Sequence, residues 1–137
     1  MPRRFWAEYR ADEFRDLDPA RTVAVLPTAA IEQHGPHLPV GVDTMIAEGM
    51  IATLAPLIPE TMDVRILPVQ AVGKSNEHIH APGTLTLTAG QALEAWVEIG
   101  LSVARAGVRK LVIVNSHGGN LDLISILSRD SAVELDA

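Results

Sequence analysis

Three short apolar runs alternate with longer segments of helical periodicity along this chain. The runs over 22–28, 64–69 and 110–115 are rich in β-branched residues and do not alternate with polar positions. Such runs are typical of strands that are buried on both faces of a parallel sheet. Apolar residues at helical spacing predict three helices, over 44–57, over 89–106 and from about 120 onward.

The order of these elements, a strand followed by a helix and repeated three times, predicts the fold class. Right-handed crossovers between parallel strands cover the sheet with helices. We therefore expect one layered α/β/α domain with a mainly parallel sheet over residues 1–137. The helix over 89–106 has the clearest boundaries, because Thr88 and Gln91 fit a capping box and Gly107 favours a helix end.

Length and composition agree with a single folded domain. The chain has 137 residues, of which 47% are hydrophobic and 20% charged, and this balance excludes a disordered tail. No apolar run approaches the ~20 residues that a membrane-spanning helix needs. The first residues lack the apolar stretch and cleavage site of a secretion signal. We therefore expect a cytoplasmic protein that does not enter a membrane.

The charge and the residue types narrow the partners. A net charge of −6, with no basic cluster beyond Arg3 and Arg4, argues against nucleic acid and anionic membranes, and favours a small molecule. The chain has no cysteine, so that any metal must be held by histidine, aspartate or glutamate. Four of the five aromatic residues lie between Phe5 and Phe14. We expect that segment to pack on the domain edge or on a neighbouring subunit of a homo-oligomer.

Polar side chains follow the first and third predicted strands, at the point where each strand ends. Glu32, His34 and Asp43 come after the first strand, with His37 among them, and His117 comes after the third. The carboxyl ends of parallel strands meet at one edge of a sheet, where ligands of open α/β folds bind. Imidazole and carboxylate without thiolate suit a catalytic Zn²⁺, Mn²⁺ or Fe²⁺ site.

Each of these residues also has a simpler interpretation. A histidine in a loop is often only a surface or capping residue, and Asp43 precedes a predicted helix and could be its N-cap. Gly118 and Gly119 could form a tight turn, or, with Asn120, an anion-binding helix N-terminus. The anion-binding interpretation leaves the polar cluster after the first strand unexplained.

Three motifs together resemble the creatininase, or creatinine amidohydrolase, family in order and spacing. They are LPTAAIEQHGPHLPVGVDT, VGKSNEHIHAPGTLTLT and VIVNSHGGN. The resemblance implies a sandwich-like α/β fold, a two-metal site, hydrolysis of a non-peptide or terminal amide C–N bond, and a cyclic oligomer that is commonly a hexamer. Matched to the family motifs, Glu32, His34, Asp43 and His117 fall on metal ligands, with Asp43 as the bridge.

The middle motif follows the second predicted strand and therefore faces the same edge of the sheet. In the family this loop borders the substrate. Glu77 and His78 are candidates for substrate contact or proton transfer, because a histidine with a pKa near neutrality suits general acid–base catalysis. A hydrated loop whose proline and glycine set a turn is the alternative interpretation. His80 lies off the family pattern and receives no role.

One position departs from creatininases proper, which carry a further carboxylate two residues after the histidine of the third motif. Here that residue is Gly119. The His-Gly-Gly-Asn form resembles other branches of the family, in which a later His-Ala-Gly…Glu segment is expected to supply the carboxylate. The 137 residues contain no such segment, and 132–135 resemble the start of a fourth strand. We therefore expect an incomplete C-terminal end, an N-terminal part of a subunit, and weak or absent hydrolysis by these residues alone.

The resemblance predicts a mechanism and leaves a second hypothesis open. A metal pair would activate a water molecule and polarise an amide carbonyl, in place of a nucleophilic side chain. The alternative is a non-catalytic or partly metallated subunit that acts in assembly. Four recognisable ligands are many for one metal ion and few for two, so that the sequence leaves both hypotheses open. The substrate could be creatinine, a formamide-bearing purine fragment or the end of a modified peptide, and Gly119 counts only against creatinine.

Overall fold

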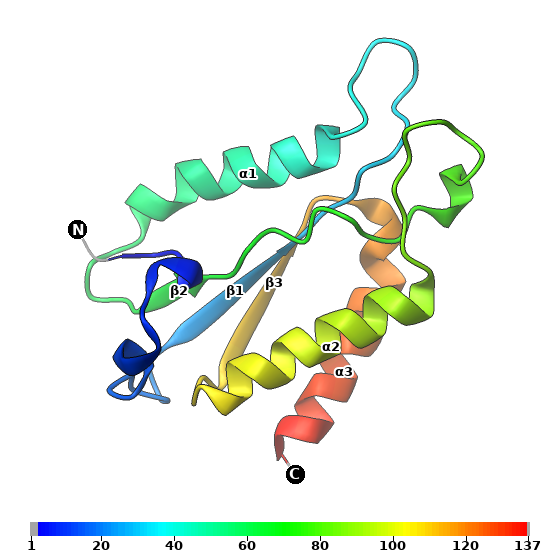
Figure 1. Ribbon diagram of the computed structural model, residues 1–137. Helices are drawn as coiled ribbons and strands as arrows, with labels where there is room; N and C mark the ends of the chain where they lie inside the picture. Colours follow the sequence, from blue (N-terminus) through cyan, green and yellow to red (C-terminus); the bar gives the residue numbers. More distant parts are fainter. Residues whose placement is uncertain (1–2, 137) are drawn as a thin grey trace.

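The computed structural model describes residues 3–136 and contains a sheet of three parallel strands (Figure 1). The strands are β1 (Val23–Thr28), β2 (Val64–Ile66) and β3 (Lys110–Asn115), in the spatial order β2-β1-β3. In the register of the sheet, Val23 lies beside both Val64 and Lys110. The predicted parallel sheet is confirmed, and β1 is its central strand.

Helices cover both faces of this sheet. Helix α1 (Val42–Leu54) lies on one face, and α2 (Ala89–Arg105) and α3 (Leu121–Asp136) pack together on the other (Figure 1). Five short 3-10 helices lie in the connections, at Trp6–Glu8, Ala11–Phe14, Ala55–Leu57, Asn76–His78 and Gly118–Asn120. This is the layered α/β/α arrangement that the element order predicted.

The alternation of side chains along β1 builds two cores. Ala24 and Leu26 face α2 and pack with Val103, whereas Val25 faces α1 and packs with Ile51. Both sets are buried, because helices cover β1 on each side. A third cluster, around the fully buried Trp96 of α2, joins α2 to α3.

The helix boundaries follow from local chemistry. Helix α2 begins with the predicted capping box, in which Thr88 Oγ1 accepts from Gln91 N at 3.1 Å and Gln91 Oε1 accepts from Thr88 N at 3.1 Å. The helix predicted over 44–57 is observed as α1, which ends at Leu54 and is followed by the 3-10 helix Ala55–Leu57. Pro56 stands at the start of that turn, where its missing N–H ends the α-helical ladder.

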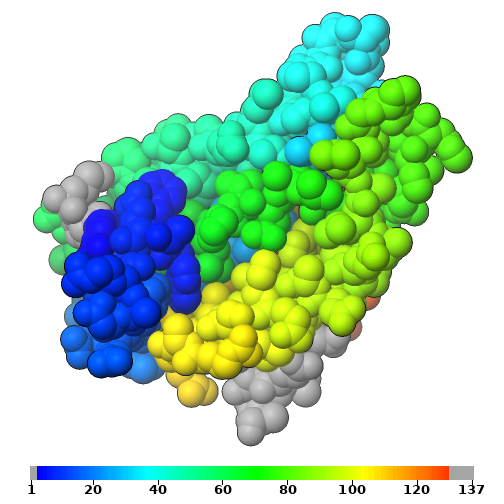
Figure 2. Space-filling model, in the orientation of Figure 1, coloured from blue at the N-terminus to red at the C-terminus, as the bar shows by residue number. Residues whose placement is uncertain are grey.

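The aromatic N-terminal segment packs on the outer edge of β2. Ile66 N donates to Arg4 O at 2.6 Å, and Phe5 forms a parallel bridge with Ile66. Trp6 contacts the core, and its ring lies 4.7 Å from that of Phe14. Figure 2 shows this segment, in blue, over one end of the domain. The segment thus protects an edge strand from pairing with another chain.

Two sequence-based expectations are wrong. Strand β3 is not buried on both faces, since Val112 is 47% exposed on the face that α1 covers over β1 and β2. Residues 132–135 do not begin a strand, because α3 continues through them to Asp136. No glycine or proline interrupts the chain after Leu121, and the alternation of so few residues cannot separate strand from helix.

The strand order creates the place for a site. The strand that follows β1 in the chain lies at one of its edges, and β3 lies at the other edge. The connection from β1 to β2 contains α1 on one face of the sheet, and the connection from β2 to β3 contains α2 on the opposite face, so the two connections diverge next to β1. Open parallel sheets bind ligands at such a switch point, outside the carboxyl ends of the strands. The segments after β1 and β3 therefore meet there. Within residues 3–136, no helix is long and apolar enough to cross a membrane.

Candidate metal centre

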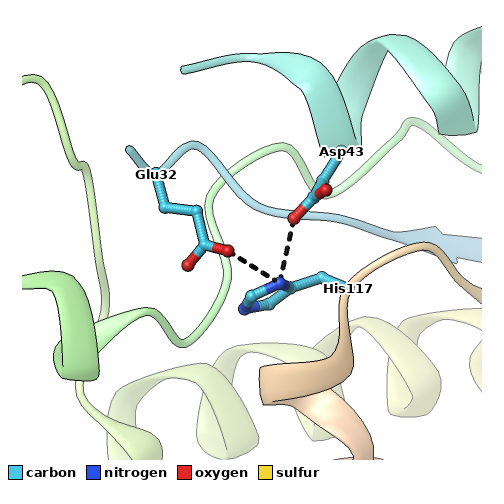
Figure 3. A group of neighbouring side chains, drawn as sticks. All are labelled: Glu32, Asp43 and His117. Carbon is cyan, nitrogen blue, oxygen red and sulfur yellow. Dashed lines mark ion pairs between the residues drawn. The ribbon is translucent and has the colours of Figure 1, made fainter. Parts of the chain in front are cut away.

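Three buried side chains converge at the switch point. Glu32 comes from the segment after β1, Asp43 from the first turn of α1, and His117 from the segment after β3 (Figure 3). Each residue offers a ligand atom, and these atoms lie within 4.8 Å of one another. The structure thus brings together three of the four metal ligands predicted from sequence.

His117 lies between the two carboxylates. Its Nδ1 is 2.9 Å from Asp43 Oδ2 and 3.3 Å from Glu32 Oε1 (Figure 3). The exposed fractions are 6% for Glu32, 7% for Asp43 and 7% for His117. Two carboxylates this deeply buried need a positive partner, because an unpaired buried charge is costly.

The other ring nitrogen of His117 determines which nitrogen is free. Nε2 lies 2.9 Å from the backbone carbonyl oxygen of Lys74, which can only accept, so Nε2 carries the proton. In the neutral ring the lone pair is therefore on Nδ1, which faces Glu32 and Asp43. Histidines that bind metals commonly donate their second N–H to a carbonyl in this way.

His34, the fourth predicted ligand, adjoins the cluster through Asp43. Its Nδ1 donates to the Glu32 carbonyl oxygen at 2.9 Å, which turns Nε2 toward Asp43 Oδ1 at 3.2 Å. That hydrogen bond and the Asp43 and Glu32 carboxylates raise the pKa of His34, against the opposing effect of burial. Asp43 thus presents one oxygen to each histidine, as a bridging carboxylate would.

The donor set fits a divalent metal ion. Glu32 Oε2 is buried and has no hydrogen-bond partner among the described residues, and two histidines turn bare nitrogens toward buried carboxylate oxygens. Lone pairs that converge without a donor between them repel one another, and a cation removes that repulsion. Nitrogen and oxygen donors of this kind suit Zn²⁺, Mn²⁺ or Fe²⁺.

The middle loop reaches the same site, as the sequence predicted. His78 Nε2 lies 3.7 Å from Glu32 Oε2, and Glu77 Oε2 lies 3.1 Å from Lys74 Nζ. Partial burial raises the pKa of Glu77, but hydrogen bonds from its own backbone amide and from Lys74 outweigh this, and the pKa falls below the ordinary value. The ligand atoms of Glu32, Glu77 and His78 also lie within 4.8 Å of one another, so these residues form a second possible ligand group.

The simpler interpretations of these residues have different outcomes in the structure. Asp43 is not an N-cap, because α1 is preceded by Gly41 and no side chain caps it. Asn120 is fully buried and uses its side chain for internal hydrogen bonds. His37 and His80 are exposed, and neither belongs to a ligand group among the described residues.

Asn120 has a structural role that sequence reasoning missed. Its Nδ2 donates to Ala29 O at 3.0 Å and to Asn115 Oδ1 at 3.1 Å, and its Oδ1 accepts from Lys74 N at 3.1 Å. One buried amide therefore ties together the segments after all three strands. Its position directly after a Gly-Gly pair gave no signal of this role.

Gly119 also has a role that the sequence did not reveal. A Cβ atom at this position would lie 2.5 Å from His117 Nε2, 2.7 Å from Glu77 Oε1 and 2.8 Å from Lys74 O. Only glycine leaves room for these three groups to approach. The space beside residue 119 is occupied by the Glu77 carboxylate of the middle loop.

The fold and the site together define an α/β protein with a candidate metal centre at the carboxyl end of a parallel sheet. The sequence model of the creatininase family, described as creatinine amidohydrolase, matches residues 7–137. The chain belongs to the creatininase family.

Curated relatives in this family have two kinds of described activity. The chain is 34% identical over 113 residues to the mycofactocin precursor peptide peptidase of Mycolicibacterium smegmatis, covering 81% of this chain and 45% of that protein. For the protein of the same name from Mycobacterium tuberculosis, identity is 37% and the shares are 74% and 42%. Identity to the creatinine amidohydrolase of Pseudomonas putida is 30%, with shares of 84% and 43%.

Solved structures agree with the fold. A crystal structure of creatinine amidohydrolase has a TM-score of 0.79 and 30% identity, and the match covers 96% of this chain and 52% of that one. Structures described as a manganese creatininase and as a Zn-Zn form of a mutant creatininase each have a TM-score of 0.78 and 28% identity. The chain therefore spans about half the length of the relatives it matches.

Proposed function

We propose that this chain forms the metal-binding part of a hydrolase that cleaves an amide C–N bond. The observation that carries the proposal is the buried cluster of Glu32, Asp43 and His117, in which bare donor atoms converge at a sheet edge. His34 adds a further nitrogen beside Asp43. We assign these four residues to the binding of a divalent metal ion, Zn²⁺, Mn²⁺ or Fe²⁺. A complete subunit could bind a second ion.

The residues have distinct roles in this proposal. A bound metal ion supplies Lewis acidity, which lowers the pKa of a water molecule and polarises a carbonyl group. Glu32, His34, Asp43 and His117 would hold the ion, and Lys74 O orients His117. Glu77 is exposed, and His78 is partly exposed beside Glu32 Oε2; we assign both residues to substrate contact or proton transfer.

The end of a short peptide is the substrate class that we favour. Identity is 34–37% to three mycofactocin precursor peptide peptidases and 30% to a creatinine amidohydrolase. The glycine at position 119 also supports a substrate other than creatinine. Both substrate types contain an amide C–N bond, so the proposed chemistry is the same.

Metal-dependent release of a terminal residue from short peptides tests this function. Mass spectrometry would follow the products for the Zn²⁺- or Mn²⁺-loaded chain, the chelated chain, and the Asp43→Asn and His80→Ala variants. We expect slow hydrolysis that disappears on chelation and in Asp43→Asn, because both remove the Lewis acid. His80→Ala is expected to match the unaltered chain, since His80 is exposed and outside the cluster.

Two results would contradict the proposal. Hydrolysis that survives complete chelation would mean that the metal is not used. Full metal occupancy without any metal-dependent hydrolysis would favour the alternative, a non-catalytic subunit that acts in assembly.

We also propose that the protein is a homo-oligomer, with a hexamer as the form expected for the family. Large apolar side chains on the outer side of α1 are exposed, among them Ile46, Met50 and Leu54, and an apolar surface of this kind favours association. Light scattering of the chain is expected to give a multiple of 14.7 kDa. Met50→Glu should lower that mass and Glu48→Gln should not. A monomer mass for the unaltered chain at micromolar concentration would contradict the proposal.

A further inference from the structure

Three histidines reach the candidate metal centre, and in each of them one ring nitrogen is held by another group of the protein. For two of them that group is a backbone carbonyl: Glu32 O for His34 Nδ1 and Lys74 O for His117 Nε2, both at 2.9 Å. A carbonyl oxygen only accepts, so the held nitrogen carries the proton. The nitrogen that faces the carboxylates is therefore bare in both neutral rings.

His78 is held in the opposite way. Its Nδ1 lies 3.0 Å from Gln33 Nε2, and Gln33 Oε1 accepts from Gly35 N at 3.0 Å. A backbone N–H can only donate, so the oxygen of the Gln33 amide must face Gly35 and its NH₂ group must face His78. The NH₂ group donates to Nδ1, which is therefore bare. The proton of the neutral His78 ring is on Nε2.

The loop around Gln33 is itself anchored, which makes this arrangement specific. Gln33 N donates to Thr84 Oγ1 at 3.1 Å, so the middle loop and the loop after β1 are joined beside the site. Glu32 N donates to Val40 O at 2.9 Å. These bonds set the position of the Gln33 side chain between Gly35 and His78.

The proton on His78 Nε2 points toward an unsatisfied acceptor. Glu32 Oε2 is 3.7 Å away, beyond hydrogen-bond distance, and this buried atom has no partner among the described residues. The proton therefore lies next to the cluster but takes part in no hydrogen bond with Glu32. A group bound between His78 and Glu32 could accept a hydrogen bond from His78 Nε2.

We propose that Gln33 is a positioning residue that makes His78 Nε2–H a hydrogen-bond donor to the substrate and prevents His78 from being a metal ligand. The inference rests on the proposed hydrolase function. In the reaction, a water oxygen bonds to the amide carbon, one proton of that water passes to the leaving nitrogen, and the C–N bond breaks. His78 keeps its proton throughout, and its Nε2–H donates a hydrogen bond to the carbonyl oxygen as negative charge develops there.

This assignment separates the two possible ligand groups. Glu32, Asp43 and His117 combine two carboxylates with a bare nitrogen, as a metal ion requires. The group of Glu32, Glu77 and His78 has a protonated nitrogen facing inward, and a metal ion cannot bind to Nε2 while it carries that proton. The first group would therefore hold the ion, and the second supplies a hydrogen-bond donor to the substrate.

Nitrogen-15 NMR of the imidazole rings tests the inference without an activity assay. The ¹⁵N-labelled chain would be recorded at about pH 8, above the ordinary histidine pKa of ~6.5, before and after addition of Zn²⁺. We expect His78 to carry its proton on Nε2 in both states. His34 Nε2 and His117 Nδ1 are expected to shift on addition of Zn²⁺, because metal binding uses their lone pairs.

The Gln33→Glu variant gives the second arm. A carboxylate can still accept from Gly35 N, but its other oxygen faces His78 Nδ1 and demands a proton there, so we expect the His78 tautomer to reverse. Gln91→Glu is the matched control, because Gln91 serves only the capping box of α2 and glutamate fits that position. The control should leave the His78 tautomer unchanged.

The outcomes are distinguishable. A proton on His78 Nδ1 in the unaltered chain, or a Zn²⁺-induced shift of His78 Nε2 like those of the ligands, would overturn the inference and leave the metal centre intact. The measurement on the unaltered chain does not depend on whether Gln33→Glu folds. Absence of any Zn²⁺ response at His34 and His117 would instead overturn the proposed function, and the inference with it.

Discussion

Replacing His117 by alanine is expected to weaken metal binding by at least ~100-fold. Changing a residue that only orients a ligand costs 10–100-fold in metal affinity, and His117 is the nitrogen donor of the cluster itself. Its Nδ1 lies 2.9 Å from Asp43 Oδ2 and 3.3 Å from Glu32 Oε1. Without the ring, two buried carboxylates remain, and His34 contacts only one of them.

Calorimetric titration with Zn²⁺ and elemental analysis after dialysis would measure the loss. His80→Ala is the matched control, because it removes an exposed imidazole three residues after Glu77 and leaves the cluster intact. Equal affinities of His117→Ala and the unaltered chain would show that the ion binds elsewhere. A similar loss in His80→Ala would mean that binding is nonspecific.

Asn120→Asp is expected to lower the free energy of unfolding by about 2–4 kcal/mol, since each unsatisfied buried polar group costs about 1–3 kcal/mol. The aspartate could still accept from Lys74 N. Its second oxygen, however, would replace an NH₂ group that donates to Ala29 O and Asn115 Oδ1. Three acceptors would then face one another in a position with no solvent exposure.

Urea unfolding followed by circular dichroism would measure this change, with Asn76→Asp as the control. Asn76 is exposed in the middle loop, so the same chemical change there should alter stability by less than about 0.5 kcal/mol. Because Asn120 joins the segments after all three strands, we also expect Asn120→Asp to weaken Zn²⁺ binding. Equal stabilities of the two variants would contradict the role assigned to Asn120.

Much of the fold follows from local patterns. Buried apolar runs predicted β1 and β2, and the capping box of Thr88 and Gln91 predicted the start of α2, because these signals depend on neighbours in the chain. The exposure of Val112 on β3 could not be predicted in this way. It depends on which face of the sheet α1 covers, and this is a property of the packing.

The candidate site divides along the same line. The sequence by itself determined that Glu32, His34, Asp43 and His117 follow strands of one parallel sheet, since chain order and topology place them at a common edge. The family motifs then made a metal site the leading expectation.

Only the tertiary structure decided which nitrogen of each histidine is free. The proton on His117 Nε2 is held by Lys74 O, 43 residues away, and the His78 ring is held by Gln33, 45 residues away. Asn120 reaches Ala29 across 91 residues. Hydrogen bonds between such distant residues form only when the sheet assembles, because loop conformations and ring orientations depend on packing rather than on neighbouring residues in the chain.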